Sequence, residues 1–556
     1  MRVGRQRDLA ARLLIGLLAV LCVGALLSQQ LTWRVDTWVY DTLLSRFEQP
    51  ADERIVIVAI DERSLSELGR WPWSRGVHAE LVDRLQRAGA RGIALNVVFA
   101  EPARDDPAGD ALLALALAES GNTVLPVMAE PAEPGGMLIE VMPMPPLIEA
   151  AAGLGHVDAK IDHDGIARHT YLRAGLGSAH WPSLAVALLD TRAGTDADRA
   201  LPGLRNPRRQ HAAPYQWVRD HHIMVPFVPH GAFAQASYLD VLDGAVDDAL
   251  LRDRWILVGV TAAGIDQGLL TPLTGGGPRL SATEYHANVL NALTTGQAII
   301  PLSGLRQWLL SIALALLPLA LYSERSPWRR PWIVSVLAAA ATLLCCALLL
   351  RYGRYWFQPT PTLAVLAAGY LVWTLSRLRQ SQRLAHSDAL TRLANRRMFD
   401  LTLTRELKAA QRSGRQLSLL LVDVDHFKHY NDRYGHQAGD DVLRRIANVI
   451  GVHARRPRDL AARYGGDELT AILPETSAAA AAALAEAIIR DVRALGIPHL
   501  GSEIAPWITL TIGMATFDPK RESGPVDLVQ RADAALYRGK HEGRDRSQRA
   551  ADAATA

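Results

Sequence analysis

Four stretches of the 556-residue chain contain no Asp, Glu, Lys or Arg, and each is long enough to form a membrane span. A helix needs about 20 mostly apolar residues to cross the hydrocarbon core of a bilayer, within a range of about 17–25 residues. The four windows fall within this range and predict four transmembrane helices. They cover residues 13–33, 307–323, 331–350 and 355–376.

The first window admits a second interpretation. Its basic start and the apolar stretch from Leu13 to Leu27 are also typical of a cleavable signal peptide. Because a clean small-x-small cleavage site is lacking, we favour an uncleaved anchor. The second window is the shortest and contains Pro318, which makes it the weakest span by itself.

Arginine clusters flank the windows and predict their orientation. Basic residues in short flanking segments mark the cytoplasmic side of a membrane protein. Four crossings place all three clusters on that side, with residues 1–12 and 377–556 cytoplasmic and residues 34–306 outside. The clusters are Arg2, Arg5, Arg7 and Arg12; Arg325, Arg329 and Arg330; and Arg377, Arg379 and Arg383.

Composition excludes several classes of function. A net charge of +3 over the whole chain is far from the strong excess of basic residues that is typical of nucleic-acid-binding proteins. The windows carry no charged residue at membrane depth, which argues against a transporter or channel. All three cysteines, Cys22, Cys345 and Cys346, lie in the windows, so we expect no disulfide in the outer domain.

Acidic residues gather at two points in the carboxyl-terminal part. An apolar run over residues 417–422 predicts a buried strand, with Asp423 and Asp425 emerging at its end. Gly465 and Gly466 lie between two strand-like segments and predict a tight hairpin turn that presents Asp467 and Glu468 beside that strand. Such carboxylates repel one another unless a cation joins them, and hard oxygen ligands select magnesium. The alternative is a solvated acidic hairpin.

Six ordered motifs connect these acids to a known family. They occupy residues 388–397 (DALTRLANRR), 423–428 (DVDHFK), 431–440 (NDRYGHQAGD), 465–469 (GGDEL), 511–515 (TIGMA) and 532–537 (ADAALY). Residues 388–546 therefore resemble the GGDEF domain of diguanylate cyclases. The resemblance implies an α/β domain with a palm-like central sheet flanked by helices, which condenses two GTP molecules into cyclic di-GMP and two pyrophosphates.

The resemblance also implies which residues carry the reaction. Asp423, the backbone carbonyl of Val424, Asp467 and Glu468 would hold magnesium or manganese. Asp467 would activate the 3′-hydroxyl, with Glu468 completing the acidic cluster. Lys428 would stabilise developing negative charge; the alternative for it is an ordinary exposed lysine.

Further family positions would contact the substrate. An amide and a carboxylate, Asn431 and Asp440, suit the edge of guanine. Lys540 and Arg544, four residues apart on one predicted helix face, suit terminal phosphates, or are simply a basic helix end. His436 is a substrate-side position or a structural histidine. The implied set is Asn431, His436, Asp440, Gly465, Gly466, Lys540 and Arg544.

Two more features of this domain affect its function. Arg456 and Asp459 form an RxxD pair at the position where the family binds cyclic di-GMP as an inhibitor; the alternative is a basic loop with this spacing by chance. Leu469 stands where phenylalanine is commoner, and we expect it to point into the sheet as a packing residue, with mild consequences.

Each cyclase domain of the family binds one GTP, so the resemblance implies a homodimer. Leu371, Leu375 and Leu378 have heptad-like spacing ahead of the domain, where a signalling helix pair is expected. We assign residues 377–387 to this linker and residues 547–556 to a disordered tail.

The outer domain, residues 34–306, alternates strand-like and helical segments and is predicted to be α/β. Strand-like runs cover residues 55–60, 92–99 and 255–260. With the spans behind it, this part resembles the second class of CHASE domain, a bacterial extracytoplasmic sensor, which implies a multi-pass protein of the inner membrane with a periplasmic or extracellular domain.

Candidate sites in this outer domain are few. His156, Asp162, His163 and Asp164 suggest a metal, but Asp-x-Asp-Gly is more often a turn. Trp71 and Trp73 are assigned to core packing rather than to a ligand pocket. We name no ligand for the sensor.

The sequence thus predicts a multidomain chain with an α/β sensor, four transmembrane helices and an α/β GGDEF domain. The predicted function is a membrane-anchored diguanylate cyclase controlled by an external signal and by its product. The alternative is a catalytically silent receptor for GTP or cyclic di-GMP. The intact polar motif positions favour the enzyme.

Overall fold

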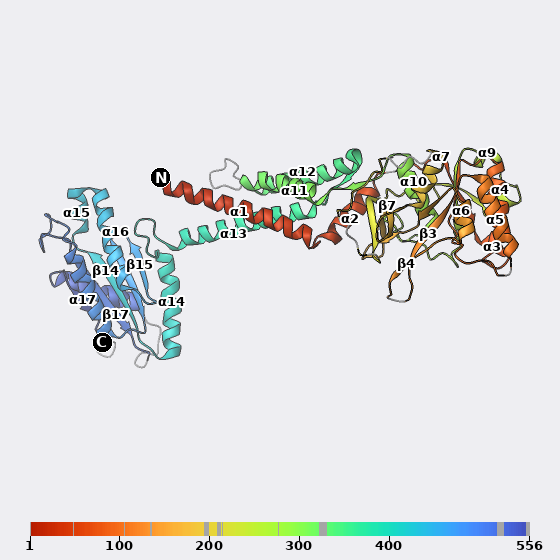
Figure 1. Ribbon diagram of the computed structural model, residues 1–556. Coiled ribbons are helices and arrows are strands. Elements are labelled where there is room, and N and C mark those ends of the chain that lie inside the picture. The colour runs from red at the N-terminus through yellow and green to blue at the C-terminus, as the bar shows by residue number, and fades with distance from the viewer. Residues whose placement is uncertain are drawn as a thin grey trace. The chain divides into compact units, whose positions relative to one another are not determined.

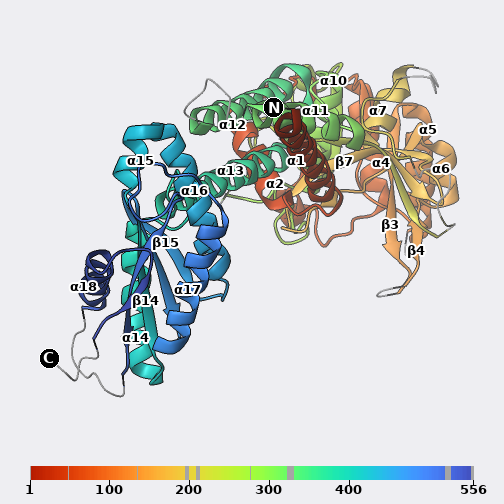
Figure 2. The same ribbon diagram turned by 90° about the vertical axis from the view of Figure 1, so that its left-hand side faces the viewer.

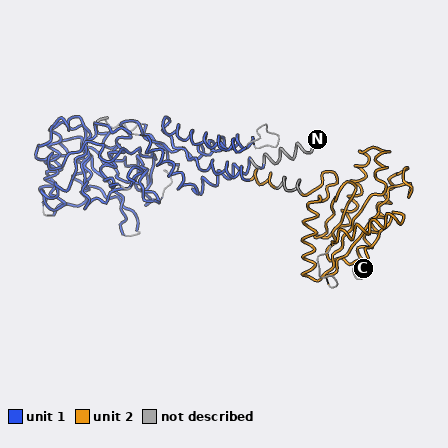
Figure 3. The backbone as a smooth tube through the Cα atoms, turned by 180° about the vertical axis from the view of Figure 1, so that it is seen from behind, with its two compact units in different colours: residues 1–371 blue, residues 372–556 orange. Residues whose placement is uncertain are grey.

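The computed structural model describes residues 2–47, 49–104, 106–133, 136–193, 200–207, 213, 215–275, 277–321, 331–519 and 527–551, with only the backbone of residues 2–13, 15, 192, 193 and 379–385. It divides into two compact units, Met1–Leu371 and Val372–Ala556 (Figure 3). Several predictions lie outside the described residues: the cluster Arg325, Arg329 and Arg330, the side chains of the amino-terminal arginines and of Arg379 and Arg383, and residues 552–556 of the predicted tail.

The apolar windows fall on helices of the first unit, the last of which, α13, continues into the second unit. Within the described residues, two helical stretches are long and apolar enough to cross a membrane, Pro331–Gly353 and Thr360–Leu378, and the bent pair α1–α2 counts as a third if it is one span. The helix of the second window is apolar but only 17 residues long. The elements are α1 (Arg2–Ser28), α2 (Trp33–Leu44), α11 (Gly304–Ala320), α12 (Pro331–Leu348) with the π-helical turn η1 (Leu349–Gly353), and α13 (Thr360–His386).

Two predicted windows differ from the helices in their limits. The first was expected to be a single span ending at Trp33, but α1 ends at Ser28 and the chain bends by 77° before α2. The fourth was expected to begin at residue 355, but strand β13 (Tyr355–Trp356) pairs in parallel with β12 (Ile300–Pro301). Pro359 precedes α13, and Pro361 lies in its first turn, where the missing N–H of proline costs no helical hydrogen bond.

A mostly parallel sheet forms the centre of the domain between α2 and α11 (Figure 1). The strands β1 and β11 are buried along nearly their whole length, as expected for a sheet covered on both faces. Only β4 runs antiparallel to its neighbour. The order is β10 (Ala234–Ser237), β1 (Ile55–Ile60), β11 (Trp255–Val260), β2 (Gly92–Leu95), β3 (Thr123–Pro131) and β4 (Leu138–Val141), with β5 (Gly153–His156) also beside β3.

Helices cover the two faces of this sheet, which confirms the predicted α/β class. Alternate residues of β1 enter different cores: Val56 and Val58 pack with α4 (Arg75–Arg87) and α5 (Pro107–Ser120). Ile55 and Ile57 pack with α7 (Leu184–Ala193) and α10 (Ala282–Thr294). Short helices lie between these elements: α3 (Glu62–Glu67), α6 (Pro145–Ala150), α8 (Tyr238–Leu242) and α9 (Asp248–Leu251).

A second, antiparallel sheet belongs to the same unit. Strand β7 (Ala167–Leu176) lies at its centre and pairs with β6 (Lys160–Ile161), β8 (Trp181–Pro182) and β9 (Trp217–Met224). The turn between β6 and β7 contains Asp162 and Asp164, and the Gly165 amide donates to the Asp162 carbonyl at 2.9 Å. The predicted Asp-x-Asp-Gly turn is therefore confirmed.

The second unit is built on a five-stranded sheet (Figure 2). Its strand order is β15 (Leu460–Gly465), β16 (Glu468–Pro474), β14 (Leu417–Val424), β17 (Leu510–Phe517) and β18 (Ser547–Arg549), with only β17 and β18 parallel. Its helices are α14 (Arg396–Ser413), α15 (Phe427–Tyr434), α16 (His436–His453), α17 (Ala478–Ala494) and α18 (Leu528–His541).

The side chains of β14 alternate between two cores. Leu420 and Val422 pack with α16 and α17 on one face of the sheet. Leu419 and Leu421 pack with α14 and α18 on the other face. The predicted palm-like sheet flanked by helices is thus present.

The start of the predicted disordered tail is wrong. Ser547–Arg549 form β18, and the Ala550 amide donates to the carbonyl of Met514 at 2.8 Å. The edge of β17 opposite β14 offers backbone partners to β18, and composition alone does not predict such long-range pairing.

Candidate functional site

The two acidic segments meet at one end of the central sheet of the second unit. Asp423, near the end of β14, lies directly opposite Glu468 on β16 in the antiparallel register. Gly466 and Asp467 form the turn between β15 and β16, and Gly466 has φ +34°, a conformation that favours glycine. The predicted hairpin is confirmed, and it brings the acids of both segments together.

Arg463 braces this turn from within β15. Its Nε and Nη2 donate to the carbonyl of Gly466 at 2.9 and 2.7 Å, and its Nη1 pairs with Asp388 at 3.2 Å. Asp388 also accepts hydrogen bonds from the amide and hydroxyl of Thr391, both at 2.8 Å. Asp388 and Thr391 belong to the motif at residues 388–397, but nothing in the sequence indicated this contact with Arg463.

Lys540 reaches the acidic end of β14 from helix α18. Its Nζ lies 2.8 Å from Oδ2 of Asp423. The helix lies close to β17 because Gly513 has no side chain: a Cβ atom there would collide with the backbone of Ala532 and Leu536. The TIGMA motif thus contributes to the position of Lys540.

Arg544 does not share a helix face with Lys540, so that prediction is wrong. Helix α18 ends at His541, and Gly543 and Arg544 both have positive φ values of 112° and 61°. The Arg544 amide donates to the carbonyl of Gly539 at 3.0 Å, closing the helix end. Glycine after the last turn is the usual signal for such an ending.

The environment of Asp423 favours a bound proton or cation. Burial raises the pKa of this carboxyl to about 6, and the nearby Asp467 carboxylate acts in the same direction, while Lys540 opposes both. Only 8% of Asp423 is exposed. A buried acid beside a second acid favours a cation, because the positive charge offsets both the lost hydration of the carboxylate and its repulsion by the second acid.

Asp425 does not emerge at the end of the strand as predicted. It is 1% exposed and accepts hydrogen bonds from the hydroxyls of Thr509 and Thr511 at 2.8 and 2.6 Å. The amide of Asp545 donates to it at 3.1 Å. Its partners show that Asp425 joins β14 to β17 and to the segment after α18.

Asn431 and Asp440 lie on neighbouring helices, α15 and α16. Oδ1 of Asn431 is buried and has no hydrogen-bond partner within the described residues. It fits against Gly439, where a Cβ atom would collide with it. The NDxxGHxxGD motif therefore places the amide of Asn431 close to the first turn of α16.

Lys428 and His436 are exposed at the starts of α15 and α16. Within the described residues, neither side chain makes a hydrogen bond or ion pair. Both are therefore accessible to a ligand, as is expected for substrate-side positions and equally for ordinary surface residues.

The donors available for a metal are two or three carboxylates and a carbonyl. Within the described residues, no group of three or more His, Cys, Asp or Glu side chains is arranged to hold a metal ion. The hard oxygen donors Asp423, Asp467, Glu468 and the Val424 carbonyl suit Mg²⁺, which usually retains waters and substrate phosphates as further ligands. The raised pKa of Asp423 agrees with a cation at this point.

The RxxD pair lies at the opposite end of β15 from the acidic turn, roughly 20 Å away at about 3.3 Å per residue. Oδ2 of Asp459 accepts from the backbone amide of Arg456 at 2.9 Å, and its Oδ1 is buried without a partner. The exposed Arg456 side chain donates to the Thr476 hydroxyl at 3.3 Å.

Leu469 is fully buried between β14 and the helices α16 and α17. Its predicted role as a packing residue is confirmed.

Two family models match the chain. The CHASE2 domain model matches residues 17–321, more than half of the chain. The model described as "Diguanylate cyclase, GGDEF domain" matches residues 385–546.

Individual relatives match the second unit. Diguanylate cyclase A of Treponema denticola is 40% identical over 163 residues, 29% of this chain and 43% of the relative. Diguanylate cyclase DgcM of Escherichia coli is 40% identical over 171 residues, 30% of this chain and 39% of the relative. The chain thus spans less than half the length of these two relatives.

A solved structure of the coiled coil and GGDEF domain of DgcB from Caulobacter crescentus, in complex with c-di-GMP, shows 37% identity. The match covers 33% of this chain and 95% of that chain, with a TM-score of 0.30. From the two family models, the chain belongs to the CHASE2 domain family, and its carboxyl-terminal part is a GGDEF domain.

Proposed function

We propose that the chain is a membrane-anchored diguanylate cyclase that condenses two GTP molecules into cyclic di-GMP and two pyrophosphates. The observation that carries this proposal is the pairing of Asp423 with Glu468 across β14 and β16, with Lys540 on the same carboxylate. Acids for a cation and an ammonium for phosphate thus meet at one end of the sheet. The names of the relatives support the same activity.

The proposed metal ligands are Asp423, the Val424 carbonyl, Asp467 and Glu468. When bound, Mg²⁺ or Mn²⁺ supplies positive charge to the α-phosphate and polarises its oxygens. Asp467 accepts the proton of the attacking 3′-hydroxyl. Lys428 stabilises the negative charge that develops on the phosphate.

The remaining residues position the nucleotide. Asn431 and Asp440 bind the guanine, and His436 lies on the substrate side. Lys540 releases Asp423 to the cation and binds the terminal phosphates together with Arg544. Gly465 and Gly466 allow the substrate to approach the turn because they have no side chains.

Product formation requires two GGDEF domains, each with one GTP, so we propose a homodimer. Leu371, Leu375 and Leu378 of α13 are 57%, 44% and 56% exposed in the single chain, and their spacing is compatible with a helix pair ahead of the domain, although lipid can also cover these side chains because they lie in a candidate membrane span. Pairing of two α13 helices would cover this apolar stripe.

We propose four crossings of the bacterial inner membrane, with the CHASE2 domain outside and the GGDEF domain in the cytoplasm. The long apolar helices and the bent pair support three of them, and α11, at 17 residues, lies at the lower end of the spanning range. The CHASE2 domain then receives an external signal. Cyclic di-GMP bound at Arg456 and Asp459 provides product inhibition.

The deciding experiment incubates the full-length protein, reconstituted in nanodiscs as a dimer, with GTP and Mg²⁺. We expect cyclic di-GMP and pyrophosphate in a 1:2 ratio, and no product from an Asp467→Asn, Glu468→Gln double variant. GTP binding without product at dimer concentrations would instead identify a silent receptor, the second candidate function.

A further inference from the structure

A cavity of about 330 Å³ lies in the first unit where α2, the β6–β7–β9 sheet and the β12–β13 pair meet. Pockets of a few hundred Å³ accommodate small molecules. The walls are partly aromatic, with Trp33, Tyr171 and Trp356 among them. The cavity also includes Asp36 and Lys160, whose charges decide what it can bind.

Two buried groups of α2 line this cavity without satisfying their hydrogen-bonding capacity. Asp36 is 2% exposed and Tyr40 is fully buried, and the hydroxyl of Tyr40 has no hydrogen-bond partner within the described residues. The Asp36 carboxylate interacts with the hydroxyls of Thr32 and Thr360, but its Oδ2 makes no close hydrogen bond in the described part of the chain. An unpaired buried polar group is energetically unfavourable, so such groups normally find a partner in a ligand or an ordered water.

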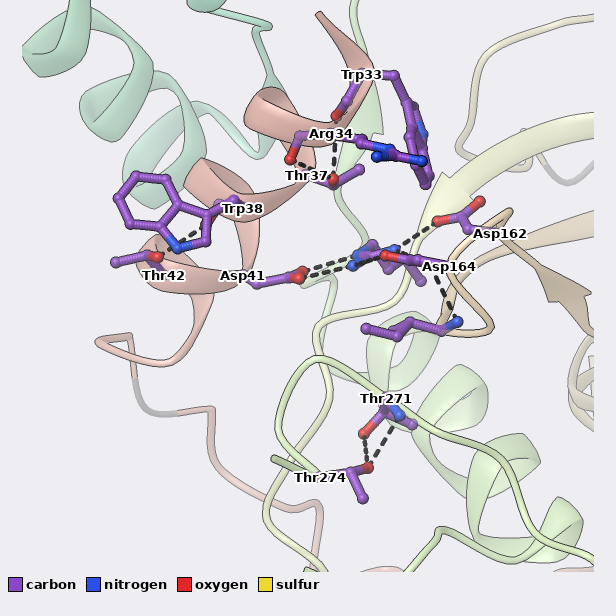
Figure 4. A network of polar contacts seen from close by, with 12 residues as sticks. Trp33, Arg34, Thr37, Trp38, Asp41, Thr42, Asp162, Asp164, Thr271 and Thr274 are labelled. Carbon is purple, nitrogen blue, oxygen red and sulfur yellow. Dashed lines mark hydrogen bonds and ion pairs between the residues drawn. The ribbon is translucent and has the colours of Figure 1, made fainter. Parts of the chain in front are cut away.

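The neighbouring acids are neutralised, whereas Asp36 is not. Arg168, which is 1% exposed, binds Asp41 at 2.7 Å, Asp162 at 2.9 Å and Asp164 at 2.8 Å. Figure 4 shows these three acids converging from α2 and from the turn between β6 and β7. Asp36 makes no ion pair within the described residues. A cationic ligand group is the partner that a buried carboxylate requires.

Lys160 is a positively charged residue of the same cavity, and its ammonium also has no counter-ion within the described residues. Its side chain makes no ion pair or hydrogen bond within the described residues, although it lines the same cavity. One cavity therefore presents a carboxylate and an ammonium, neither of which has an ion-pair partner in the described part of the chain. We propose that it binds a small zwitterion, with a primary ammonium at Asp36 and Tyr40 and an anionic group at Lys160.

The ligand would act at the beginning of the helix that leads toward the GGDEF domain. Oδ1 of Asp36 accepts a hydrogen bond from the backbone amide of Thr360 at 2.9 Å, and Thr360 is the first residue of α13. An ammonium on Oδ2 withdraws charge from this contact at the amino-terminal end of α13. This coupling rests on the proposed sensing function; the binding site itself does not.

Two sources offer this chemistry, a free amino acid and the phosphoethanolamine headgroup of a lipid. The second is relevant because α2, which lines the cavity through Asp36 and Tyr40, also exposes Val35 and Trp38, which are 50% and 67% exposed. Tryptophan at such a position is typical of the interface between membrane and water.

The test uses the full-length protein in nanodiscs. Calorimetry screens the twenty amino acids and O-phosphoethanolamine, and each ligand that binds is compared with its analogue lacking the amine and its analogue lacking the acid. We expect saturable binding that is at least tenfold weaker for both analogues. For the lipid source, native mass spectrometry compares retention of phosphatidylethanolamine with that of phosphatidylcholine.

Variants of Asp36 and Lys160 test which side chain binds each charged group of the ligand. Asp36→Asn keeps the acceptor for Thr360 and should weaken binding at least tenfold, and so should Lys160→Met. The controls Glu130→Gln and Lys408→Met, both exposed, should bind as the wild type does. Tyr40→Phe keeps the ring packed against Trp356 and should weaken binding severalfold.

The proposal is overturned if no probe binds and no phosphatidylethanolamine is retained, which would leave water as the occupant. It is also overturned if Asp36→Asn binds normally. These outcomes are independent of GTP turnover, so failure of the cyclase proposal is recognised separately. With binding established, a ligand-dependent change in the rate of cyclic di-GMP formation, absent in Asp36→Asn, tests the coupling.

Discussion

Arg463 holds the carbonyl of Gly466 with two hydrogen bonds, at 2.9 and 2.7 Å, and so ties the acidic turn to the strand that precedes it. Asp388 in turn binds Arg463 at 3.2 Å. The entry motif of the GGDEF domain and its acidic signature, 75 residues apart, are therefore one structural unit. The position of Asp467 depends on this brace, because Asp467 follows Gly466 directly.

Removal of the brace should reduce catalysis. We expect Arg463→Ala to lower kcat for cyclic di-GMP formation by about 100-fold, the scale of a misplacement of about 1 Å. Arg463→Lys keeps the positive charge but loses the planar guanidinium that makes two hydrogen bonds, and it should retain more activity than Arg463→Ala. Arg490→Ala, on the exposed side of α17, is the control. A wild-type kcat for Arg463→Ala would show that the turn needs no brace.

A methyl group at Gly439 should damage nucleotide binding specifically. Its Cβ would collide with Oδ1 of Asn431, so Gly439→Ala displaces the amide proposed to bind guanine. We expect KM for GTP to rise at least tenfold, with a smaller effect on kcat. Steady-state kinetics measures both.

Gly451 provides a matched control in the same helix. A Cβ there would meet Leu393 at 3.5 Å, an ordinary contact. Gly451→Ala should leave KM within twofold and stabilise the helix by up to about 1 kcal/mol. Equal KM values for the two alanine variants would contradict the assignment of Asn431.

Several central strands could be predicted from sequence because they are buried along nearly their whole length. The runs at β1, β11 and β14 show it, and Leu469 was placed correctly because β16 pairs with β14 in the middle of the sheet. The acidic hairpin was predictable for a local reason: two glycines and two acids fix its shape within four residues.

The features that could not be predicted depend on contacts between residues that lie far apart in the sequence. Asp425 was predicted to emerge with Asp423 at the end of the strand, but it is buried and bound by Thr509 and Thr511, more than 80 residues later. The turn containing Asp162 was predictable, whereas its link through Arg168 to Asp41 joins positions 127 residues apart. Spacing along the chain carries no signal for such contacts. Arg544 was misplaced because a regular helix was extended past Gly543.

The raised pKa of Asp423 predicts a pH-dependent requirement for magnesium. A proton on this carboxyl competes with the cation below about pH 6. Lowering the pH from 7.5 to 5.5 should therefore raise the Mg²⁺ concentration for half-maximal activity about fourfold, as expected for one group with a pKa of about 6. Asp400→Asn, an exposed acid of α14, should leave this dependence unchanged.

The raised pKa of Asp423 also makes the free energy of unfolding depend on pH. Unfolding returns the pKa of Asp423 from about 6 to its ordinary value of 3.8, so the folded state binds more protons between about pH 4 and 6. Stability therefore falls as the pH rises through this interval. In EDTA, the melting temperature of the GGDEF domain should fall accordingly, and Asp423→Asn should remove this contribution. A slope unchanged in Asp423→Asn would assign it to other groups.

The product inhibition proposed for the RxxD pair can be tested without disturbing the loop. Asp459 is held by the backbone amide of Arg456 rather than by its side chain, so Arg456→Ala leaves that hydrogen bond in place. It removes an exposed guanidinium suited to phosphate and guanine. We expect the concentration of cyclic di-GMP that halves the initial rate to rise at least tenfold, with an unchanged rate in its absence. Arg455→Ala, the exposed neighbour, is the control. Inhibition of Arg456→Ala at the wild-type concentration would show that the product acts elsewhere, most directly by competing with GTP at Asn431 and Asp440.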